Sequence, residues 1–399
     1  MNLDNLKTTD AVDVSGKRVL YRADLNVPAK DGVVTDATRL KRVLPGLKAL
    51  AARGAKVVVL SHFGRPKAGP DTENSLAPVA AELGHLLTRP VTLAADCVGD
   101  AAQSVVSAMQ LGDVVVLENT RFHKGEEKND PVFAAELAKL GDIFVNDAFS
   151  AAHRAHASTE GLTHYLPSYA GPLMMEEINA LKAALEVPRR PTAAVVGGAK
   201  VSTKIPILTN LVAKVDKLLI GGGMANTFLQ SLGVQVAQSL AEPEFHSTAR
   251  EIMAEAKERG CEIVLPTDAV IARQFKEGAP SETVDIHKVP IDAMILDIGP
   301  ASIVNMAGHL RACRTLLWNG PMGAFEIAPF GEGTFSLARE AAKLTKEGAL
   351  LSIAGGGDTV AALNAAGVTG DFSYVSTAGG AFLEWLEGNE LPGVAALAR

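Results

Sequence analysis

The sequence predicts an α/β protein made of two Rossmann-like domains, each with a doubly wound parallel sheet, joined by a connecting helix. Short β-branched runs alternate with longer stretches of helical period over most of the 399 residues. The short runs are apolar throughout rather than alternately polar, which is typical of strands buried on both faces. Strand–helix alternation of this kind implies parallel sheets with right-handed crossovers.

The expected strands follow from these apolar runs. They are 18–21, 56–60, 91–93, 114–117 and 143–145 in the first half, and 193–196, 217–220, 262–265, 294–296, 315–318 and 350–353 in the second. The clearest helix-period segments between them are 37–52, 75–87, 131–140, 203–213 and 243–259. Residues 266–292 have weak periodicity and yield no prediction.

One segment near the middle divides the series of elements into two. Met174, Ile178, Leu181 and Leu185 recur at helical spacing, and prolines bracket them on both sides. We therefore expect a domain over residues 1–170, a connecting helix within 171–187, and a second domain over 188–388.

Composition excludes several classes of protein. With 38 basic and 45 acidic side chains, the net charge is −7, which does not suit bulk nucleic-acid binding. No apolar stretch approaches the ~20 residues of a membrane span, and residues 1–10 lack the apolar core of a signal peptide. Three widely separated cysteines without a Cys-x-x-Cys pair indicate a reducing cytoplasm.

Polar and basic residues follow the expected strands of the first half. They include Asp24 and Asn26 after the first strand, His62, Phe63, Gly64 and Arg65 after the second, Arg121 and Arg154 after later ones, and Arg39 at the start of the first long helix. Ligands bind beyond the carboxyl ends of parallel strands, and guanidinium groups pair bidentately with phosphate or carboxylate oxygens. The pattern predicts an anion site, although any one arginine could be a solvated surface cation.

Glycines follow the expected strands of the second half. They occur in Gly197-Gly198, Gly221-Gly222-Gly223, Gly299-Pro300, Asn319-Gly320-Pro321 and Gly355-Gly356-Gly357-Asp358-Thr359. Glycine lets a backbone approach a bulky ligand, and helix N-termini offer free amides to phosphates. A nucleotide site is therefore expected, although the sequence has neither the usual P-loop nor the dinucleotide-binding glycine motif.

Three charged residues beside these glycines each allow two interpretations, one functional and one structural. Lys200 and Lys204 are spaced to share a face at the start of a helix, where only an anion would offset the unfavourable dipole; otherwise they are solvated. Asp358 would repel phosphate, so it is read either as a Mg²⁺ ligand or as a helix N-cap.

These motifs together resemble the phosphoglycerate kinase family over essentially the whole chain. The matching segments are Arg22-x-Asp24-x-Asn26-Val-Pro, Ser61-His62-x-Gly64-Arg65-Pro, Glu118-Asn119-x-Arg121-Phe122, Ala152-His153-Arg154-Ala155-His156, Gly197-Gly198-Ala-Lys200-Val-x-x-Lys204, Leu296-Asp297-Ile-Gly299-Pro300, Trp318-Asn319-Gly320-Pro321 and Gly355-Gly-Gly-Asp358-Thr359. Ser150 stands where the resemblance leads us to expect glycine.

The resemblance implies two domains that face each other across a cleft and close about a hinge in 171–187, with the tail 389–399 packed on the first domain. The first domain would bind 3-phosphoglycerate or 1,3-bisphosphoglycerate through Asp24, Asn26, Arg39, His62, Phe63, Gly64, Arg65, Arg121 and Arg154. The second would bind ADP or ATP through Lys200, Lys204, Gly221, Gly222, Gly299, Asn319, Pro321, Glu326, Gly355, Gly356, Gly357, Asp358 and Thr359.

The resemblance also implies the catalytic and metal-binding roles. Asp358 would hold Mg²⁺, and Arg39, Lys204, Gly356 and Gly357 would act in catalysis. The family resemblance further implies a cytoplasmic monomer acting on small molecules, without nucleic-acid or membrane partners.

The chemistry of such a kinase suits these residue types. A carboxylate acceptor is already ionised at neutral pH, so no general base is required. Catalysis must come from alignment and from neutralising the oxygens of the transferring group. Two alternatives remain open at this stage: a non-catalytic protein that clamps one anion, and a nicotinamide-dependent dehydrogenase.

Overall fold

The computed structural model describes residues 3–67 and 69–399 and divides into two compact units. Unit 1 comprises Met1–Ile178 and Glu390–Arg399, and unit 2 comprises Asn179–Asn389. Among the described residues, no helix is both long and apolar enough to cross a membrane.

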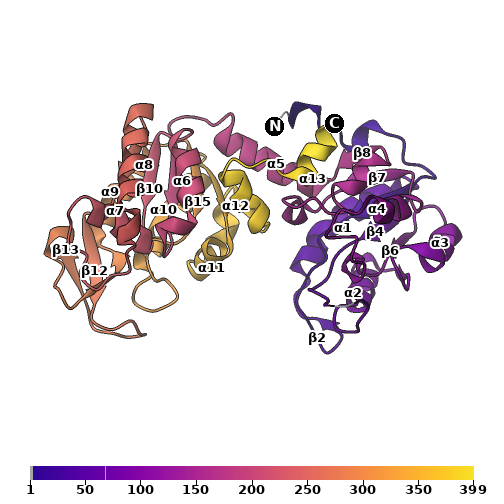
Figure 1. Ribbon diagram of the computed structural model, residues 1–399, viewed down its shortest axis with the longest axis horizontal. Helices are drawn as coiled ribbons and strands as arrows, with labels where there is room; N and C mark the ends of the chain where they lie inside the picture. The colour runs from indigo at the N-terminus through magenta and orange to yellow at the C-terminus, as the bar shows by residue number, and fades with distance from the viewer. Residues whose placement is uncertain (1–2, 68) are drawn as a thin grey trace. The chain divides into compact units, whose positions relative to one another are not determined.

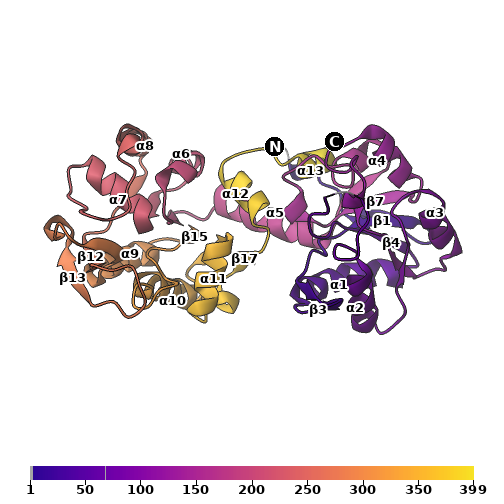
Figure 2. The same ribbon diagram turned by 60° about the horizontal axis from the view of Figure 1, so that its bottom comes forward.

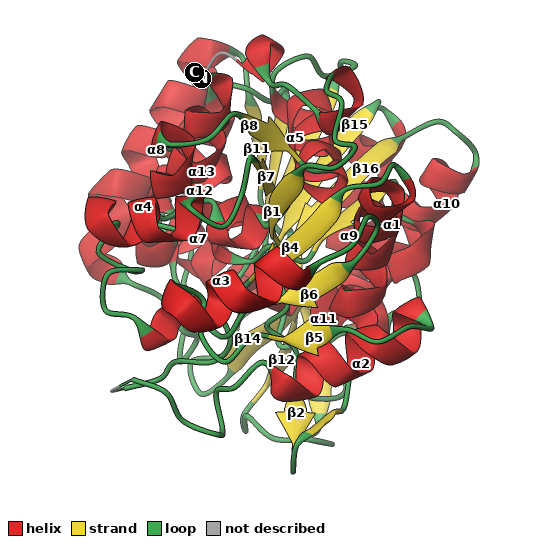
Figure 3. Cartoon of the chain, turned by 90° about the vertical axis from the view of Figure 1, so that its right-hand side faces the viewer, coloured by secondary structure: helices red, strands yellow, loops and turns green. Residues whose placement is uncertain are grey.

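Unit 1 contains a six-stranded parallel sheet in the order β5-β6-β4-β1-β7-β8 (Figure 3). The strands are β5 (Thr92–Leu93), β6 (Val114–Val116), β4 (Lys56–Leu60), β1 (Arg18–Arg22), β7 (Ile143–Asn146) and β8 (Ser168–Ala170). All five pairings are parallel, which confirms the sheet type predicted for the first half. The chain leaves β1 toward β4 on one side and reaches β7 on the other, so the strand order reverses between β1 and β7.

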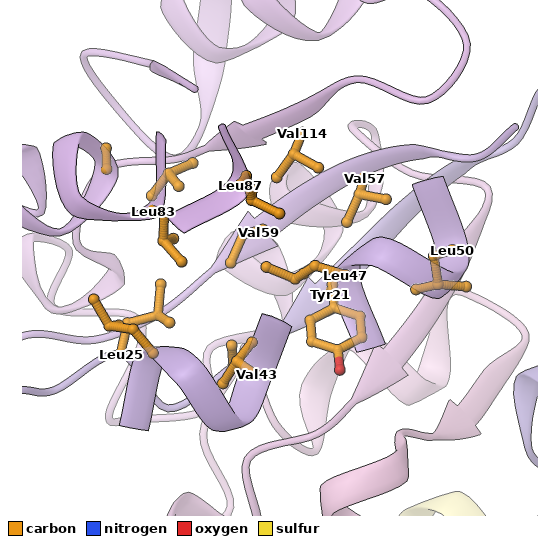
Figure 4. Close-up of a cluster of buried hydrophobic side chains, with 14 of the residues drawn as sticks. Tyr21, Leu25, Val43, Leu47, Leu50, Val57, Val59, Leu83, Leu87 and Val114 are labelled. Atoms are coloured by element: carbon orange, nitrogen blue, oxygen red, sulfur yellow. The ribbon is translucent and has the colours of Figure 1, made fainter. Parts of the chain in front are cut away.

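Helices cover both faces of this sheet. The helices α1 (Thr38–Ala52) and α2 (Ala77–Leu87) pack on one core, which contains Val57 and Val59 (Figure 4). The helices α3 (Gly99–Ala108) and α4 (Pro131–Ala138) pack on a second core, which contains Val58. Successive residues of β4 thus enter opposite cores, as expected for a strand buried on both faces. A small hairpin of β2 (Ala29–Lys30) and β3 (Val33–Val34) lies between β1 and α1 in the chain.

The carboxyl-terminal residues also belong to unit 1 (Figure 1). They form α13 (Pro392–Ala395) and a final 3₁₀ turn, Ala396–Ala398. The backbone N–H of Gly393 donates to the carbonyl of Ala152 at 2.9 Å, and Arg399 Nη1 lies 3.2 Å from Glu160 Oε1. Leu391, Val394 and Leu397 are buried, so apolar contact holds this tail in place.

The predicted middle helix is present as α5 (Pro172–Leu185). It begins at a proline, which needs no backbone hydrogen bond in the first turn. The side chain of Asp147, just after β7, accepts from the N–H groups of Leu173 and Met174 at 2.7 and 3.0 Å. The division between units 1 and 2 falls within this helix.

Unit 2 has a second six-stranded parallel sheet, in the order β11-β10-β9-β15-β16-β17. The strands are β11 (Glu262–Val264), β10 (Lys217–Ile220), β9 (Thr192–Val196), β15 (Thr315–Asn319), β16 (Leu351–Gly355) and β17 (Tyr374–Ser376). In chain order this is 3-2-1-4-5-6, the doubly wound arrangement of dinucleotide-binding folds. Its strand order reverses between β9 and β15.

Helices flank this sheet on both sides (Figure 2). The helices on one side are α6 (Ile205–Val212), α7 (Gly222–Ser231) and α8 (His246–Arg259), and those on the other are α9 (Pro300–Arg311), α10 (Glu332–Lys346) and α11 (Gly357–Ala365). The short helix α12 (Gly380–Leu386) packs against α6. Trp318 of β15 is fully buried in the core beside α9 and α10.

One strand prediction is wrong in its sheet. Residues 294–296 do form a strand, β14 (Met294–Ile298), but it belongs to a separate antiparallel sheet in the order β13-β12-β14. Its partner β12 (Asp268–Ala272) and the edge strand β13 (Ser281–Asp285), which pairs with β12, lie in the stretch for which the sequence yielded no prediction. A three-residue apolar run has no feature that distinguishes a parallel from an antiparallel partner.

Candidate active site

The carboxyl end of the unit 1 sheet carries a cavity of about 520 Å³. Most of its lining residues are basic or polar: Arg22, Asn26, His62, Gly64, Arg65, Arg121, Glu127, Ser150, Ala151, His153, Arg154 and His156. Six residues expected to bind the acid substrate are therefore brought together from the four loops that follow β1, β4, β6 and β7: Asn26, His62, Gly64, Arg65, Arg121 and Arg154. Four arginines on one cavity wall form an anion site by charge and by hydrogen-bonding geometry.

Arg22 forms the buried base of this cavity. It ends β1 and its side chain is fully buried. Its Nε donates to Ser158 Oγ at 2.9 Å, and Nη2 donates to His62 Nδ1 at 2.9 Å. Burial lowers the pKa of Arg22, which the charge of Glu126 partly offsets. Because guanidinium has only donors, Nδ1 of His62 must be the acceptor, and the proton of the neutral ring is then on Nε2.

Asp24 and Arg39 lie together beside the cavity. Arg39 Nη1 is 3.1 Å from Asp24 Oδ2 and donates to the carbonyl of Asn26 at 2.9 Å. Ser150 Oγ donates to the same Asp24 oxygen at 2.6 Å. Asn26 Oδ1 in turn accepts from the N–H of Gly64 at 3.0 Å. These contacts tie the loop after β1 to the first turn of α1 and to the loop after β4.

The side chain of Asn119 connects the next two loops. Its Oδ1 accepts from the N–H groups of Phe63 and Arg121 at 3.2 and 3.0 Å, and its Nδ2 donates to the carbonyl of Phe63 at 2.7 Å. Arg121 Nη1 donates to the carbonyl of Gly64 at 2.9 Å, which aims its guanidinium along the cavity wall. Phe63 packs into the core between α1 and α2, so its ring supports the loop from below.

Two histidines of the cavity are held neutral. Burial is the main cause that lowers the pKa of His62 well below its usual value, and the nearby arginines add to it. Burial followed by the charges of Arg121 and Arg22 lowers the pKa of His156 to about 4. At neutral pH both rings are therefore uncharged donors or acceptors, and the positive charge of the site comes from arginine.

Several lining residues were missed in the sequence. Arg22, His153 and His156 stood inside the recognised motifs without an assigned ligand role. Ser150 was noted only as a departure from the family pattern, and Glu127 was expected to be a solvated charge. Glu127 lies 3.3 Å from Arg121 Nε. The signal that could have found Arg22 is its position, since it is the last residue of a strand that faces the switch in strand order.

Unit 2 carries a cavity of about 550 Å³ at the carboxyl end of its sheet. Apolar side chains form much of its wall. They include Leu229 of α7, Leu240 after α7, and Met294 of β14. Of the residues expected to bind nucleotide, Gly222, Pro321, Glu326 and Asp358 line it. An apolar cavity with a few polar groups at one end suits a flat aromatic base joined to charged phosphates.

Other expected nucleotide residues form a hydrogen-bonded group beside this cavity. The amine of Lys204 contacts Oδ1 of Asn319, and Nδ2 of Asn319 donates to the carbonyl of Gly355 at 2.8 Å. The N–H of Gly320 donates to Oγ1 of Thr359 at 2.7 Å. Burial lowers the pKa of Lys204, while the charge of Asp358 opposes that shift. The ends of β15 and β16 are thus tied to the first turn of α11.

The predicted pairing of Lys200 and Lys204 on one helix face is wrong. A 3₁₀ turn, Val201–Thr203, separates them, and Lys204 is the N-cap of α6 rather than a residue within it. The tighter 3₁₀ turn rotates the two side chains apart. Lys200 is exposed, whereas Lys204 is half-buried and contacts Asn319.

The glycine loops serve two different purposes. A Cβ on Gly197 would lie 1.8 Å from the carbonyl oxygen of Pro321, so glycine there permits two strand ends to touch each other. Gly357, by contrast, has nothing within 4 Å of the position of a Cβ, so the start of α11 is open to a ligand. Close approach to a ligand thus explains only part of the glycine content that suggested a nucleotide.

The N-cap interpretation of Asp358 is wrong. Gly356, with φ of 99°, is the N-cap of α11, and Asp358 is an exposed acidic residue of the first turn. Gly221 and Gly299 similarly cap α7 and α9. Asp358 lines the cavity, and its exposed carboxylate offers hard oxygen atoms of the kind that can ligate Mg²⁺.

Comparison with known proteins gives a consistent result. The family model described as phosphoglycerate kinase matches residues 9–389. A phosphoglycerate kinase of Methylorubrum extorquens (strain PA1) is 61% identical over 388 residues, 97% of each chain, and one of Rhizobium leguminosarum bv. trifolii is 60% identical over 396 residues, 99% of each. The structure of phosphoglycerate kinase from Coxiella burnetii aligns with a TM-score of 0.92 at 42% identity and covers 98% of both chains.

Proposed function

Because this chain belongs to the phosphoglycerate kinase family, we propose that its two units divide the substrates of that enzyme between them. The enzyme transfers a phosphoryl group reversibly between 1,3-bisphosphoglycerate and ADP, giving 3-phosphoglycerate and ATP, in glycolysis. Unit 1 is proposed to hold the phosphoglycerate, and unit 2 the nucleotide.

The four-arginine cavity of unit 1 is the observation that carries this assignment. Arg22, Arg65, Arg121 and Arg154 offer guanidinium groups to a phosphate that carries two negative charges. Asn26, His62 and Gly64 supply the neutral polar groups of the same wall. We assign Asp24 and Arg39 to the part of the site nearest the reacting carboxylate, with Phe63 supporting the loop.

The nucleotide is assigned to the cavity of unit 2. Gly222, Pro321 and Glu326 would contact it from the cavity wall. Lys204, Asn319, Thr359 and the amides of Gly355, Gly356 and Gly357 would meet its phosphates, with Lys200, Gly221 and Gly299 at the edge of the site. Asp358 would hold Mg²⁺, which when bound would neutralise phosphate oxygens.

The chain's own residues account for the rest of the chemistry. The acceptor carboxylate is ionised at neutral pH, so the site need not remove a proton. Arg39, Lys204 and the amides of Gly356 and Gly357 are proposed to neutralise the transferring group in its transition state. Residues 171–187 are the proposed hinge about which the units would close on their substrates.

The cellular setting is part of the same proposal. The three cysteines are buried free thiols, which agrees with a reducing cytoplasm. We expect a monomer, and sedimentation equilibrium at micromolar concentration tests this.

A coupled assay of ATP formation from 1,3-bisphosphoglycerate and ADP tests the assignment. Arg39→Ala should lower kcat by at least about 100-fold, the effect of losing one transition-state donor, while ADP affinity measured by calorimetry stays unchanged. Lys41→Ala removes an exposed cation from the same helix and is the matched control. A near-normal kcat for Arg39→Ala would remove Arg39 from the mechanism.

A further inference from the structure

Three potential metal ligands lie together in unit 1, outside the cavity described above. One side-chain atom each of Asp96, Cys97 and His123 lies within 4.8 Å of the other two. Asp96 and Cys97 lie between β5 and α3, and His123 ends the 3₁₀ turn Thr120–Phe122 that follows β6. Since β5 and β6 are parallel neighbours, their carboxyl ends bring the two segments side by side.

The contacts of this cluster hold the ligand atoms toward one point. Oδ1 of Asp96 is 2.6 Å from Nε2 of His123, so these two atoms share a proton. The ring of His123 stacks on Phe133, with centroids 5.0 Å apart, which fixes the plane of the imidazole. Cys97 is fully buried in the adjacent core. Its sulfur closes the cluster from the interior.

The electrostatic surroundings favour a cation. The Cys97 thiol interacts electrostatically with two negative groups, the carboxylate of Asp96 and the buried carboxylate of Glu126. The Asp96 side chain is 42% exposed and that of His123 is 32% exposed. An ion can therefore enter from solvent, and a water molecule can complete its coordination.

We propose that Asp96, Cys97 and His123 form a binding site for Zn²⁺, with water as the fourth ligand. The ion takes the place of the proton between Asp96 and His123, and the thiol proton of Cys97 leaves to solvent as the Zn–S bond forms. Zinc binds thiolate sulfur at ~2.3 Å and imidazole nitrogen or carboxylate oxygen at ~2.0–2.2 Å, usually with four ligands. The O–N pair must therefore open from 2.6 Å to somewhat over 3 Å, which two half-exposed side chains can accommodate by rotation.

The ligand set distinguishes this site from that of Mg²⁺. A soft thiolate and an imidazole suit zinc and disfavour the hard magnesium ion, which takes oxygen ligands. Asp358, the proposed Mg²⁺ ligand, belongs to unit 2 and has no part in the cluster. The zinc site therefore does not depend on the proposed function.

Metal titration of the full-length protein tests the proposal. The protein is stripped with chelator, reduced, and titrated with Zn²⁺ by calorimetry in the presence of excess Mg²⁺ and without nucleotide. We expect one site of micromolar affinity or tighter. Co²⁺ as a spectroscopic probe should give a thiolate-to-metal charge-transfer band together with the visible bands of a four-coordinate ion.

Variants identify the ligands. Cys97→Ala should abolish the charge-transfer band, whereas Cys261→Ala, which removes another buried free thiol, should retain it. His123→Gln and Asp96→Asn, at partly exposed positions, should weaken Zn²⁺ binding by more than about 100-fold, since loss of an outer-shell partner alone costs 10–100-fold. Asp358→Asn should leave the affinity unchanged.

The possible outcomes are distinct. Absence of saturable Zn²⁺ binding in the wild type overturns the proposal, and so does a charge-transfer band that survives Cys97→Ala. Displacement of Zn²⁺ by millimolar Mg²⁺ would also overturn it. If Cys97→Ala does not fold, His123→Gln decides, because its ring lies at the surface of the cluster and folding can be checked by circular dichroism.

Discussion

Replacing Arg22 by methionine should strongly destabilise the protein, because the fully buried guanidinium of Arg22 interacts with the fully buried carboxylate of Glu126. Ser158 links the two groups: Arg22 Nε donates to Ser158 Oγ, while the N–H of Ser158 donates to Glu126 Oε2 at 3.0 Å. Burial raises the pKa of Glu126, and the charge of Arg22 is the largest cause that opposes this rise. Methionine keeps much of the side-chain volume but removes the charge.

The size of the effect follows from leaving one charge buried alone. Removing one partner of a buried charge pair costs about 3–5 kcal/mol. With a urea slope near the top of the usual range of about 1–3 kcal/mol per molar, the unfolding midpoint should fall by about 1–2 M. Without Arg22 the pKa of Glu126 in the folded state rises further above its unfolded value. The folded state then holds the extra proton, so stability falls as pH rises and the variant should recover part of its loss at pH 5.

Urea unfolding followed by far-ultraviolet circular dichroism at pH 7 and pH 5 measures both effects. Arg22→Met/Glu126→Gln, which removes both charges, should be more stable at pH 7 than Arg22→Met alone. Arg53→Met, at an exposed arginine that follows α1, is the control for loss of positive charge. A loss below about 1 kcal/mol for Arg22→Met, or strict additivity in the double variant, would refute the reasoning.

Three further predictions concern the nucleotide group and the helix between the units. Lys204→Ala should lower kcat by about 10²–10³-fold in the ATP-formation assay, and an unchanged kcat would leave Lys204 with only its contact to Asn319. Asp358→Asn should raise the Mg²⁺ concentration needed for half-maximal rate, so identical Mg²⁺ curves would contradict the ligand assignment. Burial raises the pKa of Asp147 from 3.8 to about 6, so its proton-linked stability is present below pH 3.8 and is lost as pH rises through about 6. Asp147→Asn should therefore flatten the dependence of Tm on pH over this window, and unchanged dependence would contradict the shift.

The elements that were predicted well are those whose signal is local. Residues 56–60 form β4 as expected. A short β-branched apolar run between polar residues is typical of a strand buried in a parallel sheet. The helix α5 was predicted from four apolar residues at helical spacing between prolines, and it lies within the expected range 171–187. The placement of Arg65, Arg121 and Arg154 on one cavity followed from the rule that parallel strands end at one edge.

Tertiary contacts and local turn geometry explain what the sequence did not reveal. Whether β14 pairs in parallel or antiparallel is decided by β12, which lies more than twenty residues away in the chain. Lys200 and Lys204 were placed on one helix because spacing alone does not reveal a 3₁₀ turn. Gly197 is glycine partly because Pro321, on another strand end, touches it.

By itself the sequence determined the alternation of strands and helices, the two parallel sheets and the kinase family, since each depends on residue types and spacings that the chain carries locally. Only the tertiary structure decided which side chains share a cavity, which are buried away from solvent and which have shifted pKa values. Arg22 became the buried base of an anion site, and Asp96, Cys97 and His123 became neighbours, because strand order in the sheet brings loops from separate parts of the chain to one edge. Burial and Coulomb interaction depend on distances in space, which residue spacing along a chain does not contain.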